Sequence, residues 1–233
     1  MKKIGFLIFL AALIVGFIAA NSSSIGRLGD RPFDFSVNFG GVKGSGNVAS
    51  ESRDLRDFKA IDVSGVFQVE ITAQKDFSVT IEADDNILPL IETEVHRGVL
   101  KIECDRRVSP KTPMKIIISA PDIENLETSG AANVILNSIK NAGLHIDSSG
   151  ASKILVTGET TKLVVDVSGA TKIDAEGLVA EAATVETSGA SQVAVNVIGT
   201  LRTDASGASK ITYSGTPREL NTKKSGAASV SPR

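Results

Sequence analysis

The chain has 233 residues, of which 42% are hydrophobic and 22% are charged, and this is enough for one packed domain with a terminal extension. Lysine and arginine number 25 against 27 acidic residues, and the formal net charge of −2 provides no general attraction to nucleic acid or to anionic lipid. The one cysteine, Cys104, excludes an internal disulfide framework and a multi-cysteine zinc site, and the two histidines leave little material for histidine-based catalysis. We therefore expect no nucleic-acid partner and no cofactor.

Residues 1–20 are typical of an export signal. Two lysines follow Met1, and residues 4–20 then carry no charge and no strongly polar side chain, as in a secretory signal peptide. Polar Asn21 follows the small Ala20, which suits cleavage at that point. Because the apolar run is at the lower limit for a membrane span, an uncleaved N-terminal anchor is the competing interpretation, and we expect membrane contact only through such an anchor. Both interpretations export the rest of the chain, to the periplasm, the cell envelope or the extracellular space.

Residues 21–53 are rich in serine and glycine and are predicted to form a linker. Within them, an alternation of apolar and polar side chains predicts a short strand that caps the following domain, and an adhesive edge is the alternative. The apolar members of this alternation are Phe33, Phe35, Val37 and Phe39.

Residues 54–128 contain strand-like segments separated by prolines, at 57–72, 77–83, 98–104 and 114–120. Between the second and third of them, Asp84–Pro89 is expected to form one short helical turn. We interpret this part as a less regular version of the architecture that follows, because the motif Asp62-Val63-Ser64-Gly65 returns later as Asp166-Val167-Ser168-Gly169.

An internal repeat dominates the rest of the chain. The triplet Ser-Gly-Ala recurs at intervals of 18 to 20 residues, starting at Ser129, Ser149, Ser168, Ser188, Ser206 and Ser225. A β-branched residue follows each serine by five positions, at Val134, Ile154, Ile173, Val193, Ile211 and Val230. A unit of about 19 residues is too short for a pair of helices but fits a coil of short strands with glycine at the corners. Residues 54–233 are therefore predicted to be all-β, a single-stranded parallel β-helix (β-solenoid) with an irregular N-terminal part.

The repeat also predicts rows of equivalent side chains along the solenoid. Ile154, Ile173 and Ile211 are expected to stack in one interior column. Serine and threonine recur at 128, 148 and 187 and at 152, 171, 191 and 209, and one interpretation of them is a flat hydroxyl surface. Asn133, Lys153, Lys172, Gln192, Lys210 and Ser229 form a partly basic row, which favours solubility and discourages lateral strand pairing. An anion- or glycan-binding role is the alternative.

An acidic row is the candidate functional feature. It lies two residues before each serine, at Glu127, Asp147, Asp166, Glu186 and Asp204, and Lys223 ends it. One interpretation is a ladder that binds Ca²⁺ or another cation, and the other is a solvated strand face on which the repulsion is tolerated. The glycine-rich nonapeptide of calcium-binding solenoids is absent, so we assign no metal site.

No catalytic residue is assigned. The serines belong to the repeat, and His145, near Asp147, occupies a repeat position that is otherwise variable. Enzymes that act on polysaccharides also use β-helices, but the coils here are short and uniform, and no tryptophan is present to stack on a sugar.

The order of motifs resembles a known family. RDFKAIDVSGVFQVEIT, VTIEADDNILPLIETEV and GVLKIEC, followed by the Ser-Gly-Ala units, are similar to the head GIN domain family, bacterial proteins of unknown function described as auto-transporter adhesins. The resemblance covers roughly residues 55–215. It implies a β-helical, exported bacterial protein, and the family has no established catalytic residues to carry over.

We therefore predict an exported, non-catalytic β-helical module that acts in cell-surface adhesion or as an envelope binding or scaffold protein. The expected partner is a cell-surface or matrix component, or a second copy of the chain. A β-helical enzyme acting on polysaccharide and a cation-binding structural protein are the alternatives.

Overall fold

The structure, a computed structural model, describes residues 41–233. The predicted export signal at 1–20 and the alternating segment with Phe33, Phe35, Val37 and Phe39 lie outside the described residues. The one helical element in residues 41–233 is the 3₁₀ turn η1 (Leu88–Leu90), at the place where a short helical turn was predicted. No helix in this part of the chain is long and apolar enough to cross a membrane.

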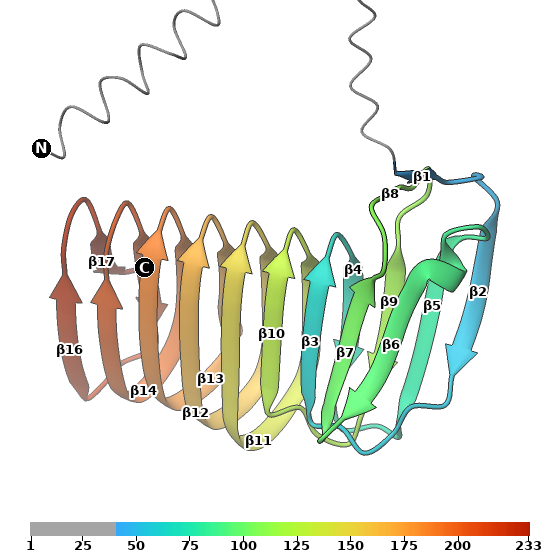
Figure 1. The fold of residues 1–233 in the computed structure, drawn as a ribbon. Coiled ribbons are helices and arrows are strands. Elements are labelled where there is room, and N and C mark those ends of the chain that lie inside the picture. The colour runs from blue at the N-terminus through green and yellow to red at the C-terminus, as the bar shows by residue number, and fades with distance from the viewer. Residues whose placement is uncertain (1–40) are drawn as a thin grey trace, which may run out of the picture. The chain divides into compact units, whose positions relative to one another are not determined.

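The described residues form a β-solenoid, as predicted (Figure 1). The strands before the repeat are β1 (Val42–Lys43), β2 (Val48–Arg53), β3 (Ala60–Gly65), β4 (Gln68–Thr72), β5 (Ser78–Asp84), β6 (Ile91–His96), β7 (Val99–Cys104), β8 (Val108–Ser109) and β9 (Lys115–Ser119). The strands of the repeat are β10 (Asn125–Gly130), β11 (Asn133–Gly150), β12 (Lys153–Gly169), β13 (Lys172–Gly189), β14 (Gln192–Ala205), β15 (Lys210–Ser214), β16 (Glu219–Lys224) and β17 (Ser229–Pro232).

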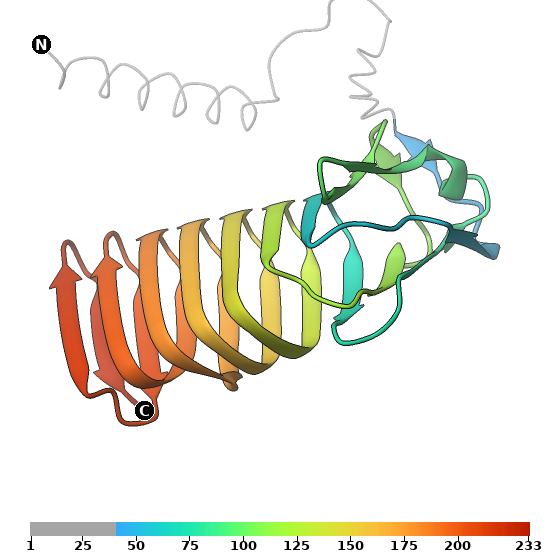
Figure 2. The same cartoon turned by 90° about the horizontal axis from the view of Figure 1, so that it is seen from below.

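Each coil contributes to two walls, because β11 to β14 are long strands that bend between them (Figure 2). We call the wall that ends at the Ser-Gly-Ala turns sheet A; its order is β6, β7, β3, β10, then the C-terminal halves of β11 to β14, then β16. Sheet B begins after the turns; its order is β2, β5, β9, β4, then the N-terminal halves of β11 to β14, then β15 and β17. From β7 to β16 and from β9 to β17 the strands pair in parallel.

The Ser-Gly-Ala turns require glycine for two reasons. Gly189 has φ +97°, a left-handed conformation that other residues rarely adopt, and a Cβ added there would lie 2.5 Å from the carbonyl oxygen of Gly169 in the coil below. Gly169 and Gly189 are register partners, so the glycines stack at the corner. The N–H of the alanine that follows, Ala190, donates to the Gly169 carbonyl oxygen at 2.8 Å, and this bond closes the ladder around the turn.

Between the two sheets, equivalent apolar side chains stack in columns. Ile154 pairs with Ile173, Ile173 with Val193, and Val193 with Ile211, and each of these side chains is at most 1% exposed. The predicted interior column is therefore confirmed. Each coil buries its apolar residues against its two neighbours, so the columns carry most of the hydrophobic stabilisation.

The serine and threonine rows do not form a hydroxyl surface, so that interpretation is wrong. Thr128, Ser148, Thr171, Thr187 and Ser209 are buried, because the alternation of side chains turns them inward beneath the turns. Their hydroxyls bond to one another across coils, with Thr128 Oγ1 donating to Ser148 Oγ at 2.8 Å and Thr187 Oγ1 donating to Ser209 Oγ at 2.9 Å. Small hydroxyl side chains thus fill the narrow corner, and several of them bond to one another there, whereas the buried Ser191 Oγ has no hydrogen-bond partner among the described residues.

The N-terminal part follows the solenoid only in β3, β4, β7 and β9. In sheets A and B the pairing beyond these strands becomes antiparallel, with β6 on β7, β5 on β9 and β2 on β5, while β1 and β8 form a separate parallel pair. Residues 48–53 fall in the segment predicted as a linker and form β2, the outer strand of sheet B at this end. Arg53 of β2 crosses to sheet A, where its Nη1 donates to the Ile91 carbonyl oxygen at 2.7 Å and to Thr93 Oγ1 at 2.8 Å. The two walls are thereby tied together, and the coil stack is capped.

Asp84 at the end of β5 fixes the loops around this cap. It is fully buried and accepts hydrogen bonds from the N–H groups of Gly46 and Lys111, both at 2.8 Å, and of Thr112 at 3.3 Å. Burial alone raises the pKa of Asp84, but the three backbone donors outweigh it and hold the pKa below its ordinary value. The ionised carboxylate therefore stabilises the folded cap.

At the opposite end, β16 pairs only with β14 and β17 only with β15 among the described strands. One inward position of this last coil is more polar than the one beneath it, because Lys224 is in register with the buried Ala205. Leu220 ends a column of buried leucines and one alanine, Ala183, and is 47% exposed. Lysine and proline on outer strands discourage pairing with another chain, and the last coil carries Lys223, Lys224 and Pro232.

Candidate functional site

Sheet A assembles the predicted acidic row. The register pairs Glu127 with Asp147, Asp147 with Asp166, Asp166 with Glu186, and Glu186 with Asp204. Successive members are one strand spacing apart, about 4.8 Å. All five side chains point away from the core, because the flanking positions on each strand are buried. The row is therefore a continuous outward line of carboxylates across the coils.

A sixth carboxylate belongs to the row and was not predicted. Asp62 of β3 pairs with Glu127, so the line begins one coil earlier. The sequence did carry the signal, because Asp62-Val63-Ser64-Gly65 has the same spacing to its Ser-Gly pair as the later units. Lysines lie in register at both ends of the row, Lys101 beside Asp62 and Lys223 beside Asp204.

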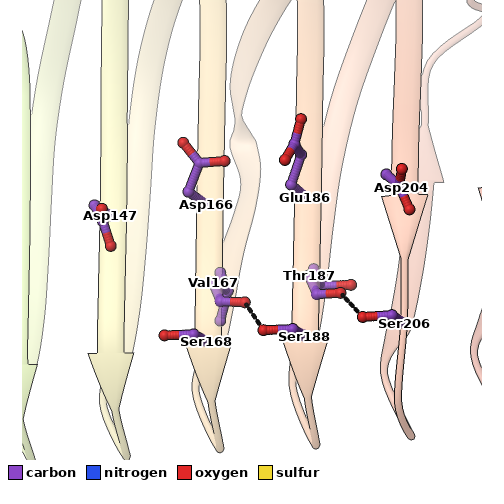
Figure 3. Close-up of a pocket in the computed structure, with 9 residues that line it drawn as sticks. All are labelled: Asp147, Asp166, Val167, Ser168, Glu186, Thr187, Ser188, Asp204 and Ser206. Carbon is purple, nitrogen blue, oxygen red and sulfur yellow. Dashed lines mark hydrogen bonds between the residues drawn. The ribbon is translucent and has the colours of Figure 1, made fainter.

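A shallow hollow of about 360 Å³ runs along the middle of this row. Figure 3 shows Asp147, Asp166, Glu186 and Asp204 on successive strands, with serines of the turns to one side. Ser206 Oγ donates to the Thr187 carbonyl oxygen at 3.2 Å, and Ser188 Oγ lies 3.5 Å from that of Val167, so these hydroxyls are turned toward the backbone of the preceding coil. The carboxylates, with the Ser168 hydroxyl beside them, are thus the groups that the hollow offers to a partner.

The row is electrostatically strained at its N-terminal end. Burial raises the pKa of Glu127, and the neighbouring carboxylates of Asp62 and Asp147 raise it further, while His145 opposes them. Burial also raises the pKa of Asp62, against the lowering effect of Lys101. Both shifts mean that the ionised form is disfavoured relative to a carboxylate in water.

His145 is the one side chain that pairs with the row among the described residues. Its Nε2 lies 2.8 Å from Asp166 Oδ2, on the next coil, and both side chains are about 40% exposed (45% and 38%). The sequence placed His145 near Asp147, whereas the contact is with Asp166. No member of the row pairs with a lysine or an arginine within residues 41–233.

The row does not gather into a coordination shell. Across residues 41–233, no three His, Cys, Asp or Glu side chains are grouped so that they could hold a metal ion. Carboxylates fixed one per strand on a flat sheet present a line of charge to a surface, whereas Ca²⁺ requires six to eight oxygens around one point.

Sheet B presents the predicted basic row on its outward side. The strand register aligns the predicted members with one another and extends the row by two strands, through Gln68 and Lys115. In order, the row is Lys115, Gln68, Asn133, Lys153, Lys172, Gln192, Lys210 and Ser229. Lys153, Lys172 and Lys210 are exposed, and none of them has an acidic partner among the described side chains. The acidic residues on the same outward side are Glu70, which lies 3.8 Å from Lys115, Glu82, which is in register with Lys115, Asp174, and Glu176, which pairs with Arg233. The two walls therefore carry rows of opposite charge.

Comparison with known proteins agrees with this architecture. The model of one family, described as "Putative auto-transporter adhesin, head GIN domain", matches residues 57–217. The chain belongs to this family. The resemblance seen in the sequence is thereby confirmed, and the family's description refers to adhesion rather than to an enzymatic reaction.

Solved structures share the fold of this head GIN domain. The crystal structure of a putative adhesin from Bacteroides fragilis NCTC 9343 is 21% identical, with a TM-score of 0.67, and the match covers 83% of this chain and 100% of the other. A putative adhesin from Parabacteroides merdae ATCC 43184 is 18% identical, with a TM-score of 0.52, covering 82% of this chain and 98% of the other. No curated protein matches the chain.

Proposed function

We propose that the protein is an exported, non-catalytic adhesion module that binds a cationic surface on cells or matrix through the outward side of sheet A. One observation carries the proposal: six carboxylates stand in a single outward line, and five of them have no ion-pair partner among the described residues. Unpaired like charges in one line attract a polymer or surface of opposite charge more strongly than scattered charges do.

The adhesive role is supported by the family and by the two solved relatives, all three of which are described as adhesins. Export is supported by the signal-like pattern of residues 1–20. A non-catalytic role is supported by the shape of the site. The hollow over the acidic row is open, and none of the residues that line it is an arginine, a lysine or a histidine. A glycosidase instead needs two carboxyl groups on either side of one bond.

The test is a pair of matched variants. In the first, the central carboxylates are neutralised by the substitutions Asp147→Asn, Asp166→Asn, Glu186→Gln and Asp204→Asn. In the second, the opposite row is neutralised by Lys153→Gln, Lys172→Gln and Lys210→Gln. Both sets are outward-facing, so circular dichroism is expected to show an unchanged fold.

Binding is measured on intact bacterial cells and on a polylysine-coated surface. We expect the first variant to lose at least tenfold in affinity for both and the second to keep wild-type affinity. Wild-type binding by the first variant would refute the role of the acidic row, and equal loss in both variants would show that binding is not confined to the outward side of sheet A.

A further inference from the structure

We propose that the cationic partner of the acidic row is the lysine row of a second copy, so that the molecules associate side by side, sheet A of one against sheet B of the next. This inference rests on the proposed function and names its partner. It begins from the observation that one chain displays two rows of opposite sign. Among the described residues, no lysine or arginine pairs with a carboxylate of the acidic row, and no carboxylate pairs with Lys153, Lys172 or Lys210.

The two rows have the same period, because both are generated by the same coils. Asp147 lies two residues before Ser149, and Lys153 lies two residues after Ala151, so the two stand at similar distances from the turn between them. The same holds for Asp166 with Lys172 and for Asp204 with Lys210. A second copy displaced sideways without rotation therefore places each of its three lysines opposite one carboxylate of the first copy. The facing pairs are Asp147 with Lys153, Asp166 with Lys172 and Asp204 with Lys210.

A polymer of unrelated period would match such a row at one or two points only. A second copy matches it at every lysine, because both rows advance by one strand spacing, about 4.8 Å, per coil. Each lysine also faces a carboxylate of the other copy, because the acidic row has one carboxylate on every coil from Asp62 to Asp204. The two rows are therefore complementary both in charge and in spacing.

The ends of the solenoid are less suited to association than its sides. Antiparallel strands β2 and β6, tied by Arg53, close the N-terminal end. The outer strands of the last coil carry Lys223, Lys224 and Pro232, which oppose strand pairing. Contact between copies is thereby directed to the walls, where the backbone is fully paired and side-chain charge decides the fit.

The area of a wall sets the strength of the contact. Sheet A presents the strands from β3 to β16, and at about 4.8 Å per strand and 3.3 Å per residue this gives roughly 30 Å by 17 Å, or about 500 Å² per copy. The total of about 1,000 Å² is at the lower limit of specific interfaces, as in transient complexes. Arg202 on sheet A and Asp174 on sheet B lie beside the rows and weaken the charge contrast. The association is therefore weak, reversible and dependent on salt.

The experiment is sedimentation velocity on the exported part of the chain over a range of protein concentrations, at low salt and in 1 M NaCl. At low salt we expect the sedimentation coefficient to rise with concentration. In 1 M NaCl, where the screening length of about 3 Å is shorter than the spacing of the row, the rise is expected to disappear. A wild-type protein that is monomeric at low salt would overturn the inference.

Two charge-reversed variants identify the faces. One carries Asp147→Lys, Asp166→Lys and Asp204→Lys, and the other carries Lys153→Glu, Lys172→Glu and Lys210→Glu. Each alone is expected to stay monomeric, because the three positions that would face one another then carry the same sign on both walls, whereas an equal mixture is expected to associate again. A variant that associates by itself, or a mixture of folded variants that does not, would overturn the inference. Glu92→Lys with Glu181→Lys reverses charges away from both rows and should leave association unchanged.

Polylysine binding separates this inference from the proposed function. If the wild type is monomeric but binds polylysine through the acidic row, only the contact between copies is refuted. If it is monomeric and also fails to bind polylysine, both proposals are refuted.

Discussion

Repulsion within the acidic row should be measurable as a stability cost. Asp147 lies in register between Glu127 and Asp166, so it has a like charge on each side. The substitution Asp147→Asn removes its charge and keeps its shape. We expect the variant to be more stable than the wild type at pH 7, in contrast to most substitutions, which destabilise.

The size of the effect follows from the strand spacing. Two unit charges about 4.8 Å apart in water repel by about 0.9 kcal/mol, and two neighbours therefore cost about 1.7 kcal/mol before screening. A screening length of about 8 Å at physiological salt reduces this to about 1 kcal/mol. For a domain of this size, that corresponds to a rise of about 2–4 °C in the thermal unfolding midpoint.

Thermal unfolding followed by circular dichroism at low and high salt is the assay, with Lys153→Gln on the other wall as the control. The gain should shrink in 1 M NaCl, because only its Coulombic part is screened. It should also vanish as the pH falls. Because the folded state raises the pKa of Glu127, the ionised side chain destabilises the fold at pH values above that raised pKa. Below the ordinary pKa of about 4.3, Glu127 is protonated in the folded and unfolded states alike, and the destabilisation is lost. A variant less stable than the wild type at pH 7, or a gain unaffected by salt, would refute the reasoning.

Two further predictions concern the scaffold. Gly189→Ala should destabilise the fold by about 3 kcal/mol or more, because the backbone there has φ +97° and the added Cβ would collide with the Gly169 carbonyl oxygen. Ser188→Ala in the same turn is the control and should change stability by less than about 0.5 kcal/mol. Chemical denaturation measures both. Asp84→Asn should lower the unfolding midpoint at pH 7. Because the folded pKa of Asp84 is lowered, the stability it contributes is present above about pH 3.9 and is lost as the pH falls further, so the two proteins should converge in acid.

The regular part of the fold could be predicted because translation along the solenoid turns sequence spacing into contact. Once Ile154 and Ile173 occupy equivalent places in successive coils, their stacking follows, and so does the alignment of Asp147 with Asp166. The same alternation places Ser148 inward, since it lies one residue from the outward Asp147. The hydroxyl-surface interpretation was wrong because it did not consider that side chains alternate between inward and outward positions along a strand, which places the serine and threonine rows inside.

The cap could not be predicted in the same way, because it depends on pairing between segments that share no repeat. β2 pairs antiparallel with β5, and the contact of Arg53 with the Ile91 carbonyl oxygen joins residues 38 positions apart. Nothing in the local spacing of these segments specifies that partner. The contact of His145 with Asp166 is intermediate: the register was predictable, but not which of two neighbouring carboxylates the imidazole would select.

The distribution of charge gives the solenoid a direction for its contacts. A stack of identical coils would grow end to end unless its last strands were blocked, and here Arg53 closes one end while Lys223, Lys224 and Pro232 oppose pairing at the other. Contacts at the ends are thus disfavoured, whereas the acidic wall favours a partner. The acidic row retains a repulsion of about 1 kcal/mol per interior carboxylate, which scattered charges would avoid. A neutral partner cannot relieve this repulsion, whereas a cationic one can. Binding should therefore raise the unfolding midpoint of the wild type more than that of Asp147→Asn, because the variant has less repulsion to lose.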